Sequence, residues 1–275
     1  MARALSVHHG SFGRAKLYEL DKPLITHAHR EGHLIFYLGG STAKVRVGDT
    51  DMALNATSAV AVSPWEPHSF SVDSGSEACL CLTLYIKPMW FLENSTSAEF
   101  SLSFGASRIE MTPIVSSWMS RLTSLLLDNQ PSERFDGFLY ETTRECFDQS
   151  WKGVENEPLA ISVSRTFNDF RVRRSLRLMQ ERFTEDVAMD QLARNVGLSR
   201  PHFFKLFKMQ MGITPNLYLN TLRAEQAIGD LMSTRKSVTD IGLDLGFSSQ
   251  ASFTRFFTSN VGISPTDYRR VAHFV

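Results

Sequence analysis

The sequence has few cysteines, no long apolar run and no recognisable export signal. Its 275 residues include three cysteines, at positions 79, 81 and 146, which is too few and an odd number for a disulfide framework. No run approaches the ~18 consecutive apolar residues of a transmembrane helix. The first ten residues are polar and histidine-rich, unlike a secretory signal. The composition therefore predicts a cytoplasmic protein with no membrane partner.

The chain also lacks net charge, but its charges are unevenly distributed. Residues 1–164 hold 13 Lys+Arg and 19 Asp+Glu, a net charge of −6, whereas residues 165–275 hold 16 and 10, a net charge of +6. A chain of this length is expected to form two domains, each large enough for its own core. The basic C-terminal domain is the one suited to a polyanionic partner such as nucleic acid.

The C-terminal part contains a repeat in which matching residues lie fifty positions apart. The matched pairs are Phe203 and Phe253, Phe207 and Phe257, Gly212 and Gly262, Pro215 and Pro265, and Tyr218 and Tyr268. Because a repeat identifies the structural unit before any single residue is interpreted, each copy is expected to fold in the same way.

Each copy predicts two helices joined by a glycine turn. In the first copy a helix over Val187–Val196 is followed by Gly197, which can end it in the left-handed conformation, and Ser199 is placed to cap the next helix. In the second copy Val238–Leu245 is the first helix and Gly246 the turn. Two helices joined in this way, the second with a polar and basic outer face, form a helix-turn-helix.

The second helix of each copy carries a buried stripe and an outward face. The stripes are predicted to be Phe203, Leu206 and Phe207 in the first copy, and Phe253, Phe256 and Phe257 in the second. We expect the DNA-binding residues to be Arg200, Pro201, His202, Phe204, Lys205 and Lys208 in the first copy, and Gln250, Ala251, Ser252, Thr254 and Arg255 in the second. For His202, half-buried packing is an equal alternative to a phosphate contact.

A close resemblance to the AraC/XylS-type transcription regulators is carried by the stretch Ile241-Gly242-x3-Gly246-Phe247-x5-Phe253-x-Arg255-Phe256-Phe257-x4-Gly262-Ile263-Ser264-Pro265-x2-Tyr268-Arg269. The resemblance covers about the last 110 residues. It implies two helix-turn-helix subdomains joined by a long helix, here roughly Pro215–Met232. In the family both recognition helices enter successive major grooves of double-stranded DNA, about 34 Å apart. It also implies a bacterial cytoplasmic protein that is associated with the nucleoid while bound, contacts RNA polymerase and activates transcription.

The outward side chains of the two copies differ in what they can read. Arginine pairs with guanine and glutamine with adenine, so Arg255 and Gln250 predict base readout by the second copy. Pro201 and Phe204 depart from the residues usual at these family positions. The first copy is therefore expected to contribute thymine contacts and phosphate charge, with Lys208 touching a phosphate.

The N-terminal part is predicted to be a small β-barrel. Short strand-like runs recur between turn clusters, at Ala15–Leu20, Leu34–Leu38, Lys44–Val47, Ala59–Ser63, Ser69–Val72 and Ala78–Ile86. Many short strands at regular spacing indicate a sandwich or barrel. With the helical C-terminal domain this makes an α+β protein. The resemblance to the AraC/XylS-type regulators implies that residues 1–110 are a cupin-like jelly-roll barrel that senses a ligand.

Histidines are concentrated in this barrel. His27 and His29 are two apart on an extended segment and so point to the same face. With His33 and His68 they resemble the cupin pattern, in which two histidines, a glutamate and a later histidine bind a metal. His33 stands where that glutamate usually is, and Trp65 where a glycine usually is.

The cupin resemblance leaves three interpretations of these residues open. His27, His29, His33 and His68 bind a divalent metal; or they line, with Trp65, a pocket for a small-molecule effector; or they are structural. Neutral imidazoles suit zinc, iron, copper or nickel. Histidines also titrate near neutral pH, so pH sensing is a further alternative.

Residues 111–151 change to helical periodicity. Apolar residues recur every three or four positions before and after a break at Asp128-Asn129-Gln130-Pro131, where Ser132 can cap the second helix. We expect an antiparallel helix pair that either covers the barrel or, as is common in the resembling family, forms a homodimer contact. Residues 152–166 are predicted to be a linker, and residues 167–275 the DNA-binding domain.

Three functional hypotheses follow. The favoured one is a ligand-responsive, sequence-specific DNA-binding transcription regulator with no enzyme activity. The second is a metal-dependent cupin enzyme with a DNA-binding appendage, which only the histidines support, because no nucleophilic triad or glycine-rich phosphate loop is present. The third is a regulator without a ligand, controlled by its abundance or by a protein partner.

Overall fold

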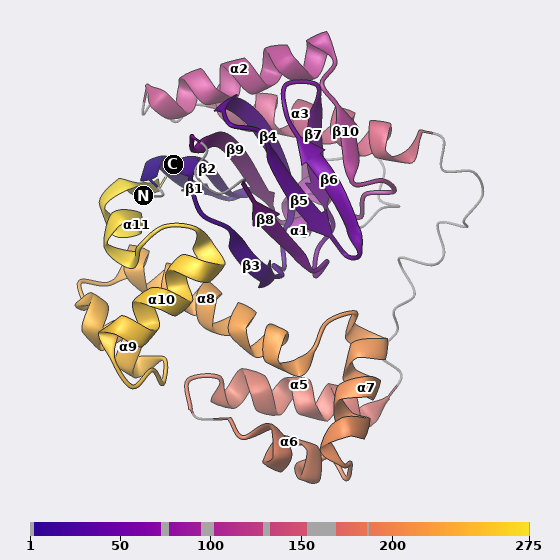
Figure 1. Ribbon diagram of the computed structural model, residues 1–275, viewed down its shortest axis with the longest axis vertical. Helices are drawn as coiled ribbons and strands as arrows, with labels where there is room; N and C mark the ends of the chain where they lie inside the picture. The colour runs from indigo at the N-terminus through magenta and orange to yellow at the C-terminus, as the bar shows by residue number, and fades with distance from the viewer. Residues whose placement is uncertain are drawn as a thin grey trace.

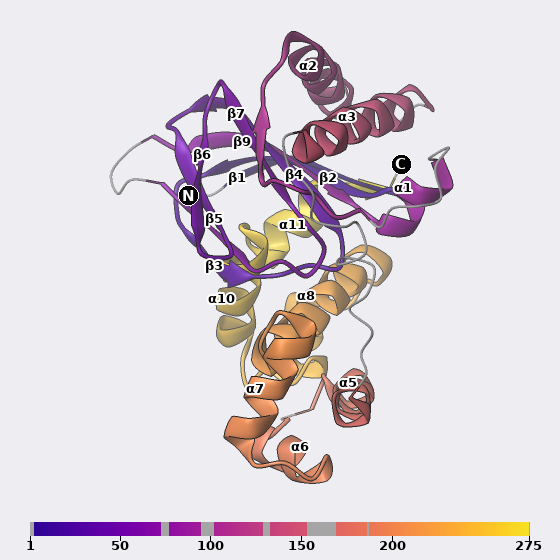
Figure 2. The same cartoon turned by 90° about the vertical axis from the view of Figure 1, so that its right-hand side faces the viewer.

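The chain folds into an N-terminal barrel, a pair of helices on one side of it and a helical C-terminal region on the other (Figures 1 and 2). The structure is a computed structural model and describes residues 3–72, 77–94, 102–128, 133–152, 169–185 and 187–274. An α+β fold with these two parts is as predicted. Among the described residues no helix is long and apolar enough to cross a membrane.

The barrel consists of two sheets that enclose a common interior. The larger sheet has the order β10 (Arg108–Glu110), β7 (Ser58–Val62), β4 (Gly32–Gly40), β9 (Cys79–Ile86), β2 (Gly13–Leu20), β1 (Arg3–Gly10) and β11 (Ala272–Phe274). The smaller sheet has the order β3 (Leu24–His27), β8 (His68–Ser71), β5 (Ala43–Val47) and β6 (Thr50–Leu54). The pairing is antiparallel except between β1 and β11, which run parallel.

Strand β9 shows why the larger sheet is covered on both faces. Its residues alternate between Leu and Ile side chains on one face and Cys, Thr and Tyr side chains on the other, and nearly all of them are buried. The Leu and Ile face packs against the helix pair α2 (Pro113–Leu127) and α3 (Glu133–Trp151). The opposite face looks into the barrel, so the interior receives side chains that can carry polar chemistry.

The helix pair lies on the side of the barrel opposite the C-terminal region (Figures 1 and 2). Thr112 caps α2 by accepting a hydrogen bond from the Val115 backbone N–H. Two apolar side chains of α2 remain exposed, Ile114 at 52% and Leu127 at 59%. The short helix α1 (Pro88–Asn94) adds two aromatic side chains, Trp90 and Phe91, to the same core.

The C-terminal region consists of two helical units joined by one long helix. The first unit contains α5 (Phe170–Arg182), α6 (Met189–Asn195) and α7 (Arg200–Met211), and the second α9 (Val238–Asp244), α10 (Gln250–Val261) and α11 (Pro265–Val271). They are joined by α8 (Pro215–Ser233), close to the range predicted for the long helix. Each unit has its own core, built around the matched phenylalanines and tyrosines of the repeat.

Some strands lie where no strand was predicted. The runs predicted from alternation correspond to β2, β4, β5, β7, β8 and β9 within one or two residues, whereas β1, β3, β6, β10 and β11 were not predicted. β3 and β6 are edge strands with largely exposed residues, so they lack the apolar alternation on which the prediction depended. The linker predicted over 152–166 and the cap predicted at Ser132 lie outside the described residues, Lys152 excepted.

Candidate DNA-binding surface and histidine cluster

The first helix-turn-helix follows the predicted plan. α6 ends at Asn195, two residues later Gly197 has φ 73°, and α7 begins at Arg200 with Pro201 in its first turn. Ser199 occupies the N-cap position with extended backbone, but among the described residues its side chain makes no capping hydrogen bond. A left-handed glycine and a proline in the first turn are the residues that this turn requires.

The second helix-turn-helix is capped more completely. Ser237 and Asp240 form a capping box at α9, and Ser249 and Ser252 form one at α10. Gly242 of α9 lies so close to α10 that an added Cβ would be 2.8 Å from the Cβ of Phe253. The close packing of the two helices therefore depends on this glycine.

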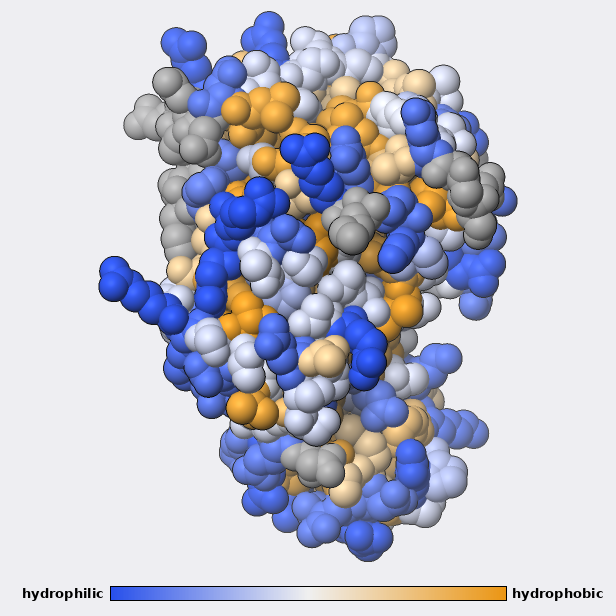
Figure 3. Space-filling view, turned by 60° about the vertical axis from the view of Figure 1, so that its left-hand side comes forward, coloured by the Kyte–Doolittle hydropathy of each residue, from blue (hydrophilic) through white to orange (hydrophobic). Residues whose placement is uncertain are grey.

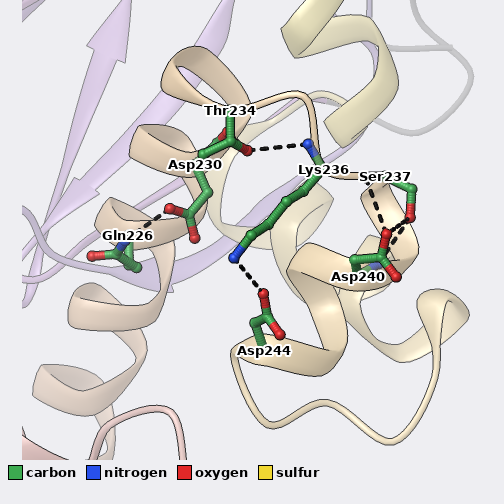
Figure 4. Close-up of polar contacts among 7 residues, drawn as sticks. All are labelled: Gln226, Asp230, Thr234, Lys236, Ser237, Asp240 and Asp244. Carbon is green, nitrogen blue, oxygen red and sulfur yellow. Dashed lines mark hydrogen bonds and ion pairs between the residues drawn. The ribbon is translucent and has the colours of Figure 1, made fainter.

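Side-chain contacts also fix the junction between α8 and the second unit (Figure 4). Lys236 Nζ lies 2.7 Å from an Asp244 carboxylate oxygen, which joins the end of the connection to α9. The Thr234 hydroxyl accepts a hydrogen bond from the Lys236 backbone N–H, and Gln226 donates one to Asp230 within α8. Of these contacts, the one between Lys236 and Asp244 ties the connection after α8 to the second unit.

Both recognition helices present their predicted outward residues at the surface. Exposed side chains are Arg200, Pro201, His202, Lys205, Lys208, Gln250, Ala251 and Arg255, and partly exposed ones are Phe204, Ser252 and Thr254. His202 is exposed, so the half-buried alternative was wrong. The roles of all these residues toward DNA stay predictions.

Two partners of the recognition side chains were not predicted. Asp190 of α6 accepts from Arg200 at 3.1 Å, and Thr239 of α9 donates to Gln250 at 2.8 Å. Both partners lie on the first helix of their helix-turn-helix (α6 or α9), facing the start of the second. Such contacts hold a side chain at the position where it would meet a base or phosphate. Proximity across a turn is not visible in sequence spacing, which explains why these partners were missed.

The space-filling view shows how the two ends of the molecule differ (Figure 3). Hydrophobic residues gather over the upper part, formed by the barrel and its helix pair, and hydrophilic ones dominate the lower lobe. On α5, Arg173, Arg174 and Arg177 line a shallow cleft beside Phe170, which is 64% exposed. Arg171 instead pairs with Asp169 at 2.6 Å.

Four predicted histidines meet inside the barrel. His27 ends β3, His29 follows it, His33 lies on β4 and His68 begins β8, and all four are buried. Ligand atoms of His27, His29 and His68 all lie within 4.8 Å of one another. The ring centroid of His33 is 4.4 Å from that of His68, so it adjoins this group.

The imidazoles of the cluster are neutral. Burial lowers the pKa of His27, His29 and His33 well below the usual value and that of His68 to about 4. Nδ1 of His27 lies 2.6 Å from the Ile25 carbonyl, and Nδ1 of His68 lies 2.8 Å from the Glu66 carbonyl. Since a carbonyl only accepts, these Nδ1 atoms carry the proton and leave Nε2 with a free lone pair.

Three ring nitrogens of the cluster lack a hydrogen-bond partner among the described residues. They are His29 Nε2, His33 Nδ1 and His68 Nε2. A buried polar atom without a partner costs about 1–3 kcal/mol and calls for an explanation, such as an ion or a ligand. Neutral imidazole nitrogens are ligands for divalent transition metals, so the cluster is chemically suited to hold one.

Trp65 does not join the histidines, although it was predicted to line the same site. Its backbone has φ 63°, which is unusual for a residue with a side chain. Its ring stacks on Tyr218 of α8, with centroids 5.3 Å apart and planes at 25°. It therefore belongs to the contact between the barrel and the C-terminal region.

Arg14, Lys16 and Tyr85 lie near the histidine cluster, and the sequence did not predict them there. The register pairs Arg14 of β2 and His33 of β4 with Tyr85 of β9, and the Arg14 guanidinium lies 4.2 Å from the Tyr85 ring centroid. Lys16 points into the same interior, where burial, aided by Arg14, lowers its pKa well below the usual value. The available signal was alternation: Lys16 lies on the strand predicted over Ala15–Leu20, and Arg14, two residues before it, lies just outside that prediction but within β2.

Comparisons with known proteins agree with this architecture. A family model described as a helix-turn-helix domain matches residues 192–271. An uncharacterized HTH-type transcriptional regulator of Staphylococcus aureus (strain COL) is 38% identical over 102 residues, which cover 37% of this chain and 14% of the relative. The lactose operon transcription activator of Staphylococcus xylosus is 27% identical over 120 residues, covering 44% of this chain and 42% of the activator. The chain thus spans less than half the length of these curated relatives.

A solved structure shares the fold of nearly the whole chain. It is wild-type ToxT from Vibrio cholerae with unsaturated fatty acid bound, which is 14% identical with a TM-score of 0.57 and 94% coverage of each chain. At this identity the likeness shows the fold alone, namely a barrel followed by two helix-turn-helix units.

Proposed function

We propose that this chain, whose residues 192–271 form an AraC-type helix-turn-helix domain, is a sequence-specific DNA-binding transcription regulator. One observation carries the proposal: α7 follows α6 and α10 follows α9, each after a glycine turn, and both α7 and α10 begin with exposed side chains that are largely polar or basic. A helix-turn-helix reads bases with the N-terminal residues of its second helix. The net charge of +6 in residues 165–275 favours the phosphate backbone.

The test is genome-wide mapping of bound DNA, followed by salt titration of binding to a recovered site. We expect a discrete motif with two half-elements about 10–10.5 base pairs apart, centre to centre, and an affinity that falls as salt rises. Weak binding to all sequences, without a discrete motif, would contradict specific recognition.

The barrel is the part that receives a signal. ToxT, which has the same fold, is described with an unsaturated fatty acid bound, and this supports an effector site in the N-terminal part here. A ligand regulates only if it binds two states of the protein unequally. The measurement is affinity for a recovered site with and without candidate effectors, and an affinity that no effector changes would favour a regulator without a ligand.

The remaining partners follow from the same proposal. The protein acts in the bacterial cytoplasm on the nucleoid, contacts RNA polymerase and activates transcription. Activation is supported by the name of the Staphylococcus xylosus relative, which describes that protein as a transcription activator. Exposed Ile114 and Leu127 on α2 are the apolar side chains available for a homodimer contact. Sedimentation of the wild type and of Leu127→Arg tests the dimer, which the arginine is expected to dissociate.

A second candidate function, a metal-dependent enzyme with a DNA-binding appendage, has the histidine cluster in its favour. We expect regulation and no turnover. A purified protein that holds a stoichiometric redox-active metal and oxidises or hydrolyses a small molecule would support the enzyme instead.

A further inference from the structure

We propose that His27, His29 and His68 hold one divalent first-row transition metal ion, and that the DNA-binding region senses this ion through α8. The inference rests on the proposed function and gives the effector a chemical class. It is carried by two independent observations, which are the geometry of the three imidazoles and the contacts that their segments make with α8.

The geometry fits a metal ion rather than an organic effector. With Zn–N bonds of about 2.0–2.1 Å, tetrahedral ligands have nitrogens about 3.3–3.4 Å apart. The three ligand atoms already lie within 4.8 Å of one another, so small side-chain rotations would complete the site. The ring centroids of these histidines are 4.3–5.3 Å apart, so the rings nearly touch and no organic molecule fits between them.

The surroundings of the three rings match those of metal ligands. The carbonyls of Ile25 and Glu66 accept from Nδ1 of His27 and His68, which is the outer-shell contact that orients a ligating imidazole. The Nε2 atoms of His29 and His68 are buried and lack a partner among the described residues. A metal would satisfy both atoms.

Charged side chains near the cluster and the type of ligand atom both affect which ion the site would hold. The Arg14 guanidinium opposes a cation in the cluster, and Glu31, whose carboxylate lies 3.8 Å from it, offsets this. His33 stacks on Tyr85 with planes at 24° and lies beside the three proposed ligands. Three imidazoles without a thiolate favour Zn²⁺, Co²⁺, Ni²⁺ or Cu²⁺ over Mg²⁺ or Ca²⁺.

The segments that carry the ligands are also those that contact α8. Ala28, between His27 and His29, accepts a hydrogen bond from the Thr221 hydroxyl at 3.0 Å. Arg30, next to His29, pairs with Glu225 at 2.9 Å. A change in the backbone at His29 therefore reaches α8 within one or two residues.

The loop before His68 makes the third contact with α8. Trp65 stacks on Tyr218, and the Trp65 backbone N–H donates to the His29 carbonyl at 2.7 Å. Tyr218, Thr221 and Glu225 are spaced by three and four residues, so they share one face of α8. This face rests on the two segments that a metal would draw together.

The second helix-turn-helix is attached to the barrel differently. β11 pairs with β1, Lys16 donates to the Val261 carbonyl at 3.2 Å, and His9 Nε2 lies 2.8 Å from the Tyr268 hydroxyl. This unit is held by the barrel, whereas the first unit is positioned through α8. A metal that shifts α8 against the barrel thus changes the placement of α7 relative to α10, which decides whether both helices fit successive grooves.

Metal binding is tested on the full chain after removal of metal with a chelator. Zn²⁺ is titrated by calorimetry, and Co²⁺ by its visible absorption, which reports coordination. We expect one ion per chain in the wild type, lost in His68→Gln and in His29→Gln, and retained in the exposed-histidine control His273→Gln. Absence of saturable binding, or binding that both cluster variants retain, would overturn the site.

The coupling is tested by affinity for a recovered DNA site with and without Zn²⁺. We expect Zn²⁺ to change this affinity at least about fivefold, the lower end of typical coupling between sites. Thr221→Val, which removes the bond to Ala28, is expected to bind Zn²⁺ normally and to lose most of its effect on DNA affinity. Ser233→Ala, at the exposed end of the same helix, is the matched control and retains the effect.

A readout without DNA separates this inference from the proposed function. Amide hydrogen exchange in Pro215–Ser233 is expected to slow on adding Zn²⁺ in the wild type but not in His68→Gln. If the protein binds no specific DNA, the proposed function fails, and exchange still decides the coupling. Zn²⁺ binding that alters neither exchange in α8 nor DNA affinity would overturn the coupling.

Discussion

At the scale of single residues, the two recognition helices offer different chemistry. α10 presents Gln250 and Arg255, which can hydrogen-bond to adenine and guanine, whereas α7 presents Pro201 and Phe204 among lysines. Base discrimination is therefore expected to be concentrated in the second half-element, with the first contributing phosphate and apolar contacts.

Replacing Arg255 with alanine tests this asymmetry. Loss of a bidentate guanine contact is expected to cost about 1–3 kcal/mol of binding and to erase the preference at one base pair. Competition binding against single-base variants of a recovered site gives both quantities. Arg108→Ala, an exposed arginine on the barrel strand β10, is the control, and specificity unchanged in Arg255→Ala would refute this docking of α10.

His9 makes the contact between barrel and C-terminal region sensitive to pH. Its pKa is lowered to about 3, mainly by burial and further by the positive charges of Arg14, Lys16, Lys87 and His8. The usual value is 6.5, so between pH 6.5 and about 3 the unfolded chain binds the proton and the folded one does not. The stability that neutral His9 contributes is therefore fully present above pH 6.5 and is lost as pH falls.

The measurement is the urea unfolding free energy at pH 7 and pH 5. Within this window each pH unit below 6.5 is worth up to about 1.4 kcal/mol per group. His9→Gln, which keeps a hydrogen-bonding group toward Tyr268, is expected to show a shallower loss than the wild type. His202→Gln, an exposed histidine, keeps the wild-type slope; equal slopes in all three proteins would contradict the assignment.

At the scale of elements, each helix-turn-helix is fixed by its turn and by one close approach. Gly197 and Gly246 adopt φ 73° and 83° at equivalent positions of the two copies. In the second copy Gly242 has no side chain, so α9 packs closely against α10 at Phe253. Both devices are backbone requirements, which accounts for glycine at these positions.

Gly242→Ala is expected to destabilise the protein. The added Cβ would lie 2.8 Å from the Phe253 Cβ and force α9 from α10, at a cost of about 1–3 kcal/mol as for other overpacked cores. Gly229→Ala in α8 is the matched control, because nothing lies within 4 Å of its added Cβ, and should stabilise by about 0.5–1 kcal/mol. Urea unfolding compares them, and equal stability of the two variants would contradict the packing argument.

At the scale of the whole molecule, the barrel and the two DNA-reading units form one connected structure. The C-terminal strand β11 extends the larger sheet of the barrel, so residues 272–274 lie beside the first strand. The two units are separated by the rigid length of α8, and α10 contacts the barrel through β3 as well. For a given position of α8 against the barrel, the separation of the recognition helices is fixed, which predicts strict spacing of the half-elements.

Inserting half a helical turn, about 5 base pairs, between the half-elements tests this spacing. It rotates one half-element to the opposite face of the duplex, so only one recognition helix can bind, and affinity should fall to that of a single half-element. Inserting a whole turn is the control for added length. Full affinity after the half-turn insertion would mean that the units move independently.

The sequence by itself determined the local elements and the DNA-binding part. The fifty-residue repeat, its glycines and its phenylalanine stripes specify two helix-turn-helix units, because turn conformation and helical periodicity depend on near neighbours in the chain. Alternation specified the strands that are buried on at least one face. The same spacing placed His27 and His29 on one face, and the resemblance to the cupin pattern added His33 and His68; all four are buried together.

Only the tertiary structure decided what depends on distant parts of the chain. The pairing of β11 with β1, the burial of Arg14 and Lys16 beside the histidines, and the stacking of Trp65 on Tyr218 join segments separated by up to the whole length of the chain. No local pattern encodes such contacts, because they follow from how two separately formed cores pack against each other. They also connect the histidine cluster to α8, which no spacing in the sequence indicates.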